Sequence, residues 1–139
     1  MIRLQNVSKR YPDSGEAISQ INLQIDRGEL LFLTGPSGSG KSTLLKIIAL
    51  ITAPTRGLLY FDDRNITRLS RNNISKYRAR MGLVFQDHRL LNDRNVYENV
   101  ALPLRINGFR SKEIPGRVRA ALDKVSLLHK EKSLPMALS

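Results

Sequence analysis

Apolar and polar residues alternate at short intervals in the first 25 residues, and this pattern predicts extended structure. Residues 2–7 place apolar side chains at short intervals, and Ile21, Leu23 and Ile25 alternate with polar neighbours. This two-residue period is typical of strands that are buried on one face. A turn signal, Asp-Arg-Gly-Glu, follows at 26–29.

An almost continuous apolar run occupies 30–34, and it predicts a strand buried on both faces, as in a parallel sheet covered by helices. A glycine- and serine-rich loop follows at 35–40. The pattern then predicts a helix over 41–51, ended by Pro54 and Gly57, and a short strand over 58–61.

The second half of the chain is less regular. Residues 81–85 return to strand character, and residues 92–105 mix polar and apolar positions around Pro103. Ser111 is predicted to cap a helix with a frayed first turn, because Pro115 and Gly116 come early in it. Helical spacing relates its apolar positions, which are Ile114, Val118, Ala121, Leu122 and Val125.

The loop at 35–42 carries the most specific chemistry in the sequence. It fits the phosphate-binding pattern G-x-x-x-x-G-K-[ST] and consists of Gly35, Pro36, Ser37, Gly38, Ser39, Gly40, Lys41 and Ser42. Its glycines allow backbone N–H groups to turn inward around an anion, and the following helix presents its positive dipole end. Lys41 is predicted to reach the β- and γ-phosphates, and Ser42 to bind Mg²⁺. A flexible linker is disfavoured, because the loop lies between two apolar elements.

Other candidates are weaker when each is taken alone. Tyr11 has a ring that can stack on a nucleobase, although a partly buried surface tyrosine has the same sequence pattern. Gln86 follows a predicted strand. Its side-chain amide is interpreted either as a group that binds Mg²⁺ or orients a water molecule, or as an ordinary polar group on the surface. Asp62 and Asp63 are interpreted as the turn after a short antiparallel strand rather than a metal site. Both histidines, His88 and His129, are predicted to be solvated.

Composition narrows the function classes further. The chain has 139 residues, no cysteine and two histidines, which excludes a disulfide scaffold, a thiolate metal site and a cysteine nucleophile. No signal-peptide pattern or membrane-length apolar run is present, which predicts a soluble chain, cytoplasmic or peripheral to a membrane.

The formal net charge of +11 indicates polyanionic partners, and the stretch 64–80 is basic without any acidic residue. That stretch is open to three interpretations: a solvated face, a membrane-proximal surface, or a nucleic-acid site. Nucleic acid is the least favoured partner, because aromatic residues are sparse and do not interleave with the basic ones.

The order and spacing of Tyr11, the loop 35–43 and Gln86 resemble the ATP-binding subunit of ATP-binding-cassette (ABC) transporters, over the whole chain. The resemblance implies Mg²⁺ and ATP as cofactors, with Tyr11 at the adenine. It places the loop amides from Gly35 to Thr43 and Lys41 at the phosphates, and Ser42 and Gln86 at the metal. Gln86 is also implied in coupling to a membrane partner.

The resemblance implies an α/β fold of the P-loop NTPase class, with an ABC-type core and an antiparallel β subdomain. Residues 1–86 would form this nucleotide-binding core, and 87–139 the Gln86 region and the first part of a helical subdomain. Residues 34–43, 85–94 and 96–104 are similar to the ABC ATPases of bacterial cell division. Lipoprotein-release and macrolide-export ATPases are the alternatives, and they usually lack the run at 86–91. A GTPase is disfavoured, because the sequence has no Asn-Lys-x-Asp motif.

The family's signature motif would begin at Leu138 and Ser139, so the resemblance implies an incomplete ATPase. The Walker B aspartate, the catalytic glutamate and the switch histidine are expected after Ser139. The chain alone is therefore expected to bind nucleotide weakly, without hydrolysis, and to be poorly soluble. The whole protein is expected to form a head-to-tail homodimer with a permease-like partner, peripheral on the cytoplasmic side of the inner membrane.

Overall fold

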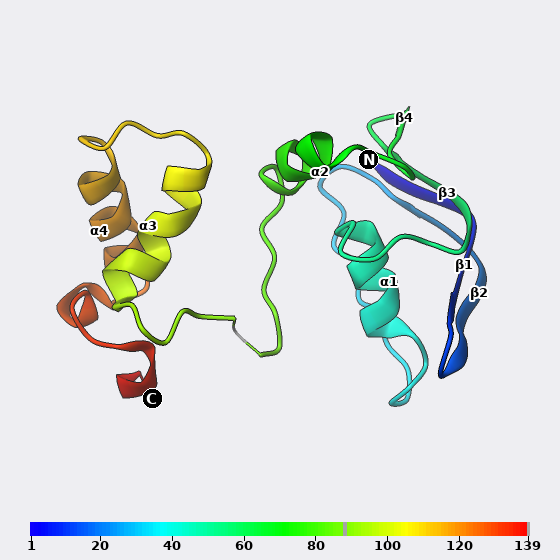
Figure 1. Ribbon diagram of the computed structural model, residues 1–139, viewed down its shortest axis with the longest axis horizontal. Coiled ribbons are helices and arrows are strands. Elements are labelled where there is room, and N and C mark those ends of the chain that lie inside the picture. The colour runs from blue at the N-terminus through cyan, green and yellow to red at the C-terminus, as the bar shows by residue number, and fades with distance from the viewer. Residues whose placement is uncertain (88, 139) are drawn as a thin grey trace. The chain divides into compact units, whose positions relative to one another are not determined.

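The computed structural model describes residues 1–87 and 89–138, and it divides the chain into two compact units, Met1–Leu83 and Val84–Ser139 (Figure 1). His88, predicted to be solvated, lies outside the described residues. His129 is exposed.

A four-stranded antiparallel sheet forms the first unit. Its spatial order is β2-β1-β3-β4. The strands are β1 (Ile2–Tyr11), β2 (Gly15–Ile25), β3 (Arg56–Phe61) and β4 (Arg64–Asn65). The predictions of extended structure at the N-terminus and over 58–61 are confirmed. The predicted turn after β3 is confirmed too, since Asp62 and Asp63 join β3 to β4.

Helix α1 (Lys41–Ile48) lies beside this sheet (Figure 1) and buries Leu44, Ile47 and Ile48. The predicted helix end at residue 51 is wrong by three residues, because Leu50 adopts a left-handed conformation with φ of 54°. Helix α2 (Arg71–Arg78) arises from the basic stretch and buries Tyr77. The shared core of the first unit consists of Leu4, Val7, Ile18, Leu44, Ile47, Ile48, Leu50, Leu59, Ile66 and Tyr77.

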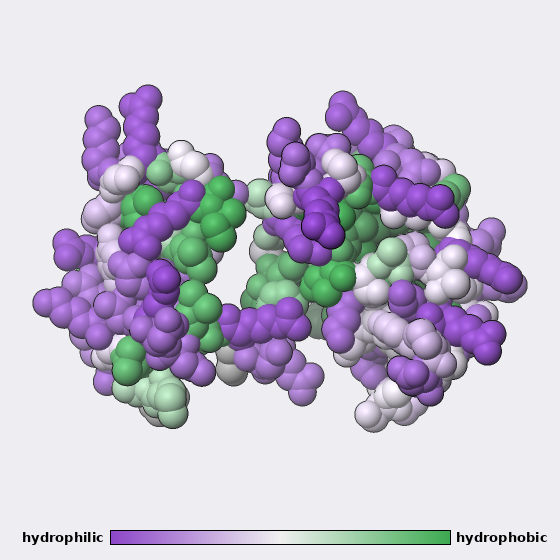
Figure 2. All heavy atoms as spheres, viewed as in Figure 1, coloured by the Kyte–Doolittle hydropathy of each residue, from purple (hydrophilic) through white to green (hydrophobic). Residues whose placement is uncertain are grey.

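The predicted strands at 30–34 and 81–85 do not form in the described chain. Both segments are irregular. The side chains of Leu30 and Phe32 are each 79% exposed, and that of Val84 is 98% exposed. A strand needs a neighbour that satisfies its backbone N–H and C=O groups, and no described segment pairs with either run. Hydrophobic side chains consequently reach the surface of both units, as Figure 2 shows.

The second unit is helical. Its elements are α3 (Val96–Ile106), α4 (Ile114–Lys124) and two 3₁₀ turns, Leu128–Lys130 and Pro135–Ala137. They enclose a small core of Val96, Ala101, Ile114, Val118 and Leu122. No helix in the described residues is both long and apolar enough to cross a membrane.

Two details of this unit differ from the sequence-based expectations. The mixed pattern at 92–105 conceals α3, whose Asn95 side chain accepts a hydrogen bond from the Glu98 N–H at 2.8 Å. The N-cap of α4 is Glu113 and not Ser111, because residues 111–113 form a turn before the helix. The helix therefore begins beside Pro115, which is tolerated in a first turn.

Candidate functional site

Three glycines shape the loop that precedes α1. Gly35, Gly38 and Gly40 have φ values of 146°, 82° and 88°, a region that side-chain-bearing residues rarely adopt. Gly40 is the N-cap residue of α1, and its carbonyl accepts the first helical bond, from Leu44 at 2.9 Å. The loop therefore curls immediately before the helix begins.

Gly40 also makes the closest approach between the loop and the sheet. A Cβ added at this position would lie 2.5 Å from the Ala17 carbonyl oxygen and would collide with the Ile18 side chain of β2. A residue without a side chain is therefore required for space as well as for backbone conformation. This contact attaches the loop to the β1–β2 hairpin.

The ammonium group of Lys41 turns back over the loop. Its Nζ donates to the carbonyl oxygens of Gly35 and Pro36 at 2.8 and 2.7 Å, and to Ser39 Oγ at 3.3 Å. The positive charge is consequently held over the loop 35–39. Carbonyl groups are its partners here, and phosphate oxygens form stronger bonds with a charged donor.

The first turn of α1 adds free backbone donors next to the loop. The N–H groups of Lys41, Ser42 and Thr43 precede the first helical bond, so they have no acceptor within the helix. The turn contains no acidic residue that would compete with a phosphate for these donors. Peptide dipoles add positive potential at this end.

The donors present fit a nucleoside triphosphate with Mg²⁺. The cradle offers backbone amides and one ammonium group, and Ser42 is exposed at its rim. Within residues 1–87 and 89–138 no group of three or more His, Cys, Asp or Glu side chains is placed to hold a metal alone. Magnesium commonly takes few protein ligands and completes its shell with phosphate and water oxygens, so a single hydroxyl suits it.

Tyr11 lies at the end of β1, in the hairpin that Gly40 contacts. It is paired with Gly15, and the preceding cross-strand pairs are Arg10 with Glu16 and Lys9 with Ile18. Its ring is partly exposed, and Lys9 Nζ lies 5.0 Å from the ring centroid. The described contacts thus connect the hairpin of Tyr11 to the loop, while its role toward adenine stays a prediction.

Gln86 belongs to the second unit, where it is exposed in a turn. The loop 35–43 belongs to the first unit. Its predicted roles in binding Mg²⁺ and in coupling therefore stay predictions.

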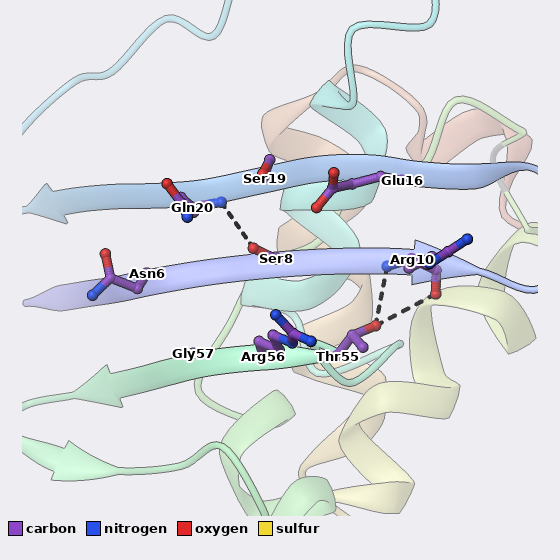
Figure 3. Close-up of a pocket in the computed structure, with 9 residues that line it drawn as sticks. All are labelled: Asn6, Ser8, Arg10, Glu16, Ser19, Gln20, Thr55, Arg56 and Gly57. Carbon is purple, nitrogen blue, oxygen red and sulfur yellow. Dashed lines mark hydrogen bonds between the residues drawn. The ribbon is translucent and has the colours of Figure 1, made fainter.

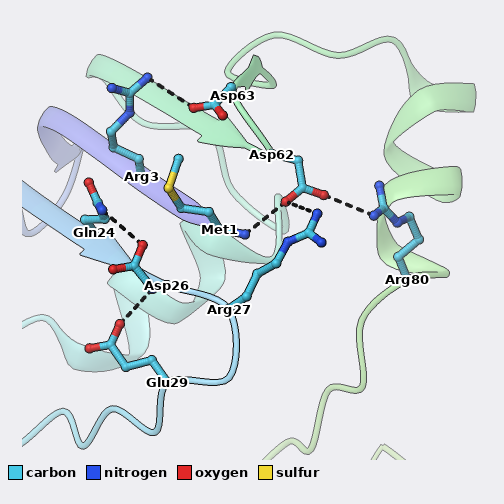
Figure 4. Close-up of polar contacts among 9 residues, drawn as sticks. All are labelled: Met1, Arg3, Gln24, Asp26, Arg27, Glu29, Asp62, Asp63 and Arg80. Atoms are coloured by element: carbon cyan, nitrogen blue, oxygen red, sulfur yellow. Dashed lines mark hydrogen bonds and ion pairs between the residues drawn. The ribbon is translucent and has the colours of Figure 1, made fainter.

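Asp62 is the centre of a cluster of ion pairs in the first unit (Figure 4). Its carboxylate lies 2.9 Å from the Met1 ammonium, 3.1 Å from Arg27 Nη2 and 3.3 Å from Arg80 Nη2. The bond from the Met1 ammonium, followed by that from Arg27, lowers the pKa of Asp62 from 3.8 to about 2. One carboxylate thus ties together the turn before 30–34 and the segment after α2.

Replacement of Asp62 by Asn is expected to destabilise the protein in a pH-dependent way. Because folding lowers this pKa, the ionised carboxylate stabilises the folded state above about pH 4, and that contribution disappears as the pH falls towards about 2. Urea unfolding should therefore separate wild type from Asp62→Asn at about pH 6 and much less at about pH 2.5. Asp63→Asn, at a 75% exposed side chain, is the matched control. A gap of the same size at both pH values contradicts the assignment.

The basic stretch 64–80 contains two kinds of cation: those whose side chains bond to other parts of the first unit, and those exposed without an ion pair in the described chain. Arg78 donates to the carbonyls of Ala49 and Leu50, and Arg80 pairs with Asp62. Exposed cations without an ion pair in the described chain are Arg64, Arg68, Arg71 and Lys76. The membrane-proximal interpretation of these exposed cations stays a prediction.

A hollow of about 810 Å³ lies on the sheet, separate from the loop (Figure 3). Its lining comes from β1, β2 and the start of β3, and consists of Asn6, Ser8, Arg10, Glu16, Ser19, Gln20, Thr55, Arg56 and Gly57. The pairing of β1 with β2 is irregular here, and two lining residues, Asn6 and Gln20, have φ of 48° and 49°. The Gln20 N–H donates to Ser8 Oγ at 2.8 Å. It contains no residue of the predicted nucleotide site.

Comparisons with known proteins agree with this geometry. Residues 18–139 match the family described as ABC transporter. The chain is 48% identical over 139 residues to the cell division ATP-binding protein FtsE of Escherichia coli (strain K12), covering all of this chain and 63% of that protein. It is 44% identical to FtsE of Haemophilus influenzae, covering 64%, and 39% identical to the methionine import ATP-binding protein MetN of Francisella tularensis, covering 41%.

Solved structures give the same result. A dimeric post-hydrolysis state of the ATP-binding cassette MJ0796, bound to ADP and Pi, superposes with a TM-score of 0.91 at 34% identity, over all of this chain and 63% of that one. A second dimeric structure of MJ0796, described as a bacterial ABC transporter cassette, gives 0.92 at 35% identity. The fold class expected from the resemblance is therefore confirmed. The chain spans 63% to 64% of the length of its FtsE relatives. It belongs to the ABC transporter family.

Proposed function

We propose that this chain is the ATP-binding module of an ABC ATPase and holds Mg·ATP at the loop 35–43. The observation that carries the proposal is the position of Lys41, whose ammonium lies over the loop carbonyls at the start of α1. A cation held over the loop, next to the free N–H groups at the start of a helix, is suited to a polyphosphate.

Each group of the loop has a definite task in this proposal. Lys41 exchanges its bonds to Gly35 and Pro36 for bonds to the β- and γ-phosphates. The amides of the first turn of α1 donate to phosphate oxygens, and the Ser42 hydroxyl joins the Mg²⁺ shell with Gln86. The bound ATP supplies a phosphoanhydride bond whose hydrolysis powers movement of a membrane partner.

The relatives support a role in bacterial cell division. The most similar proteins named above carry that description, at identities of 48% and 44% over the whole chain. We infer a permease-like partner of the FtsX type, at the cytoplasmic face of the inner membrane. The alternative is the ATPase of a lipoprotein-release or macrolide-export transporter. The dimeric MJ0796 structures support a homodimer of the whole protein, and we propose a head-to-tail arrangement for it.

The present chain is proposed to bind nucleotide without turning it over. Hydrolysis requires a positioned water and charge stabilisation around the γ-phosphate, and the loop 35–43 supplies only part of this. The exposed run 30–34 also leaves unpaired backbone groups beside apolar side chains, which favours aggregation. Hydrolysis is therefore assigned to the whole protein.

Competition between nucleotides tests the proposal. A fluorescent ATP analogue should bind in the presence of Mg²⁺ and should be displaced by ATP and by inorganic triphosphate. Displacement by GTP at much lower concentrations than by ATP would favour the GTPase alternative. No binding of the analogue at all would contradict the proposed function.

Replacement of Tyr11 by Ala is expected to weaken ATP binding by about 1–3 kcal/mol, which is the usual contribution of a base stacked on an aromatic ring. Inorganic triphosphate has no base, so its affinity should stay unchanged. Competition titrations of the two ligands against the fluorescent analogue provide the comparison. Equal losses for both would show that Tyr11 only stabilises the hairpin.

A further inference from the structure

Two adjacent side chains of α2 donate hydrogen bonds to the carbonyl groups at the C-terminal end of α1. The Tyr77 hydroxyl donates to the Ile48 carbonyl at 2.8 Å, and this bond is buried. Arg78 donates from Nε to the Ala49 carbonyl at 3.1 Å and from Nη2 to the Leu50 carbonyl at 2.6 Å. We call Tyr77 and Arg78 the helix clamp.

The clamp completes the termination of α1. The Leu50 N–H donates to the Ile47 carbonyl at 2.9 Å, and the Ile51 N–H to the Lys46 carbonyl at 2.8 Å. This is a Schellman arrangement, which satisfies two helix carbonyls and leaves the last ones open. Tyr77 and Arg78 take those remaining carbonyls, and the guanidinium places a positive charge at the negative end of the helix dipole.

Leu50 shows that this end is held tightly. It adopts φ of 54°, where glycine is the usual residue, yet its side chain is buried in the core at 8% exposure. A bulky residue stays in that region only when its surroundings impose the conformation. The buried Leu50 side chain and the Arg78 bond to its carbonyl are two such restraints.

The opposite end of the same helix carries the phosphate cradle. Helix α1 has 8 residues, and at a rise of about 1.5 Å per residue it is only about 12 Å long. A helix this short moves as a rigid body, so a shift or tilt at its C-terminus also moves its N-terminus. Restraint at Ile48, Ala49 and Leu50 therefore determines how precisely the amides of Lys41 to Thr43 are aimed.

We propose that Tyr77 and Arg78 are positioning residues for the phosphate site, acting through α1 rather than by touching the nucleotide. This inference rests on the proposed function, since it concerns the same site.

The test compares substitutions on one helix in the whole protein. Arg78→Met keeps the aliphatic stem and removes the donors, and Tyr77→Phe removes only the hydroxyl. Arg71→Met is the matched control, because Arg71 is exposed on α2 and its side chain has no bond in the described residues. Dissociation constants for Mg·ATP and for inorganic triphosphate are measured, together with amide hydrogen exchange of residues 41–43 well below the unfolding temperature.

Arg78→Met should raise both dissociation constants about 5- to 10-fold and accelerate exchange at residues 41–43, as expected for loss of bonds from a charged group. Tyr77→Phe should raise them about 2- to 5-fold, and Arg71→Met should leave them unchanged. A purely structural role would lower the melting temperature without changing affinity or exchange, and that result overturns the inference. If Arg78→Met does not fold, Tyr77→Phe decides. Failure of the wild type to bind ATP refutes the proposed function instead.

Discussion

Replacement of Lys41 by Ala is expected to remove most of the Mg·ATP affinity while leaving the fold in place. Among residues 1–87 and 89–138, the hydrogen bonds of the ammonium go to Gly35, Pro36 and Ser39 of the loop, so its loss opens no cavity in the core. Bonds to a charged donor contribute about 1.5–3 kcal/mol each, so loss of the bonds to two phosphates predicts a dissociation constant at least about 100-fold higher. Displacement of a fluorescent ATP analogue measures it.

Lys46→Ala is the matched control for this experiment. Lys46 lies on the same helix but in its last turn, and its side chain is exposed. The variant should bind Mg·ATP as the wild type does, with a circular-dichroism spectrum and melting temperature close to those of Lys41→Ala. Equal affinity of the Lys41 and Lys46 variants would mean that the phosphates are not held at this loop.

Replacement of Gly40 by Ala is expected to damage both the loop and the fold. The backbone at φ of 88° costs a side-chain-bearing residue about 1–2 kcal/mol. The new Cβ would also lie 2.5 Å from the Ala17 carbonyl oxygen and collide with the Ile18 side chain. Either the loop or the buried part of β2 must move, so we expect a loss of about 3 kcal/mol or more in the free energy of unfolding. Urea denaturation measures this loss.

Gly38→Ala separates the cost of the backbone conformation from the cost of the steric collision. Gly38 has φ of 82°, but a Cβ there would meet nothing within 4 Å. The substitution should therefore cost only the conformational part, about 1–2 kcal/mol. Equal losses in the two alanine variants would show that the contact between Gly40 and the hairpin is unimportant for stability.

The sequence predicted the elements that local signals determine. Alternating apolar positions identified β1, β2 and β3, and the glycine spacing with Lys41 identified the loop and the start of α1. Each of these signals acts within a few residues. The run 30–34 has an equally strong apolar pattern, yet it is irregular and exposed because a strand depends on a distant partner. Pattern alone cannot supply that partner.

Two further features were missed for different reasons. Helix α3 carries a recognisable start signal, Asn95 followed by Glu98 three positions later, but Pro103 obscured the helical period. The contacts of Tyr77 and Arg78 with the end of α1 join positions 28 to 29 residues apart and have no sequence signature. The left-handed Leu50 was equally hidden, since glycine is the expected residue there.

Amide hydrogen exchange of the protein, with and without Mg·ATP, tests the central claim most directly because it shows where the nucleotide binds. If the loop holds the triphosphate, peptides that cover 35–43 should exchange more slowly when Mg·ATP is added, and inorganic triphosphate should reproduce the effect. Peptides of β3, which line the hollow at Arg56 and Gly57, should not change. Protection confined to β3, or no protection at 35–43 at saturating Mg·ATP, would contradict the account.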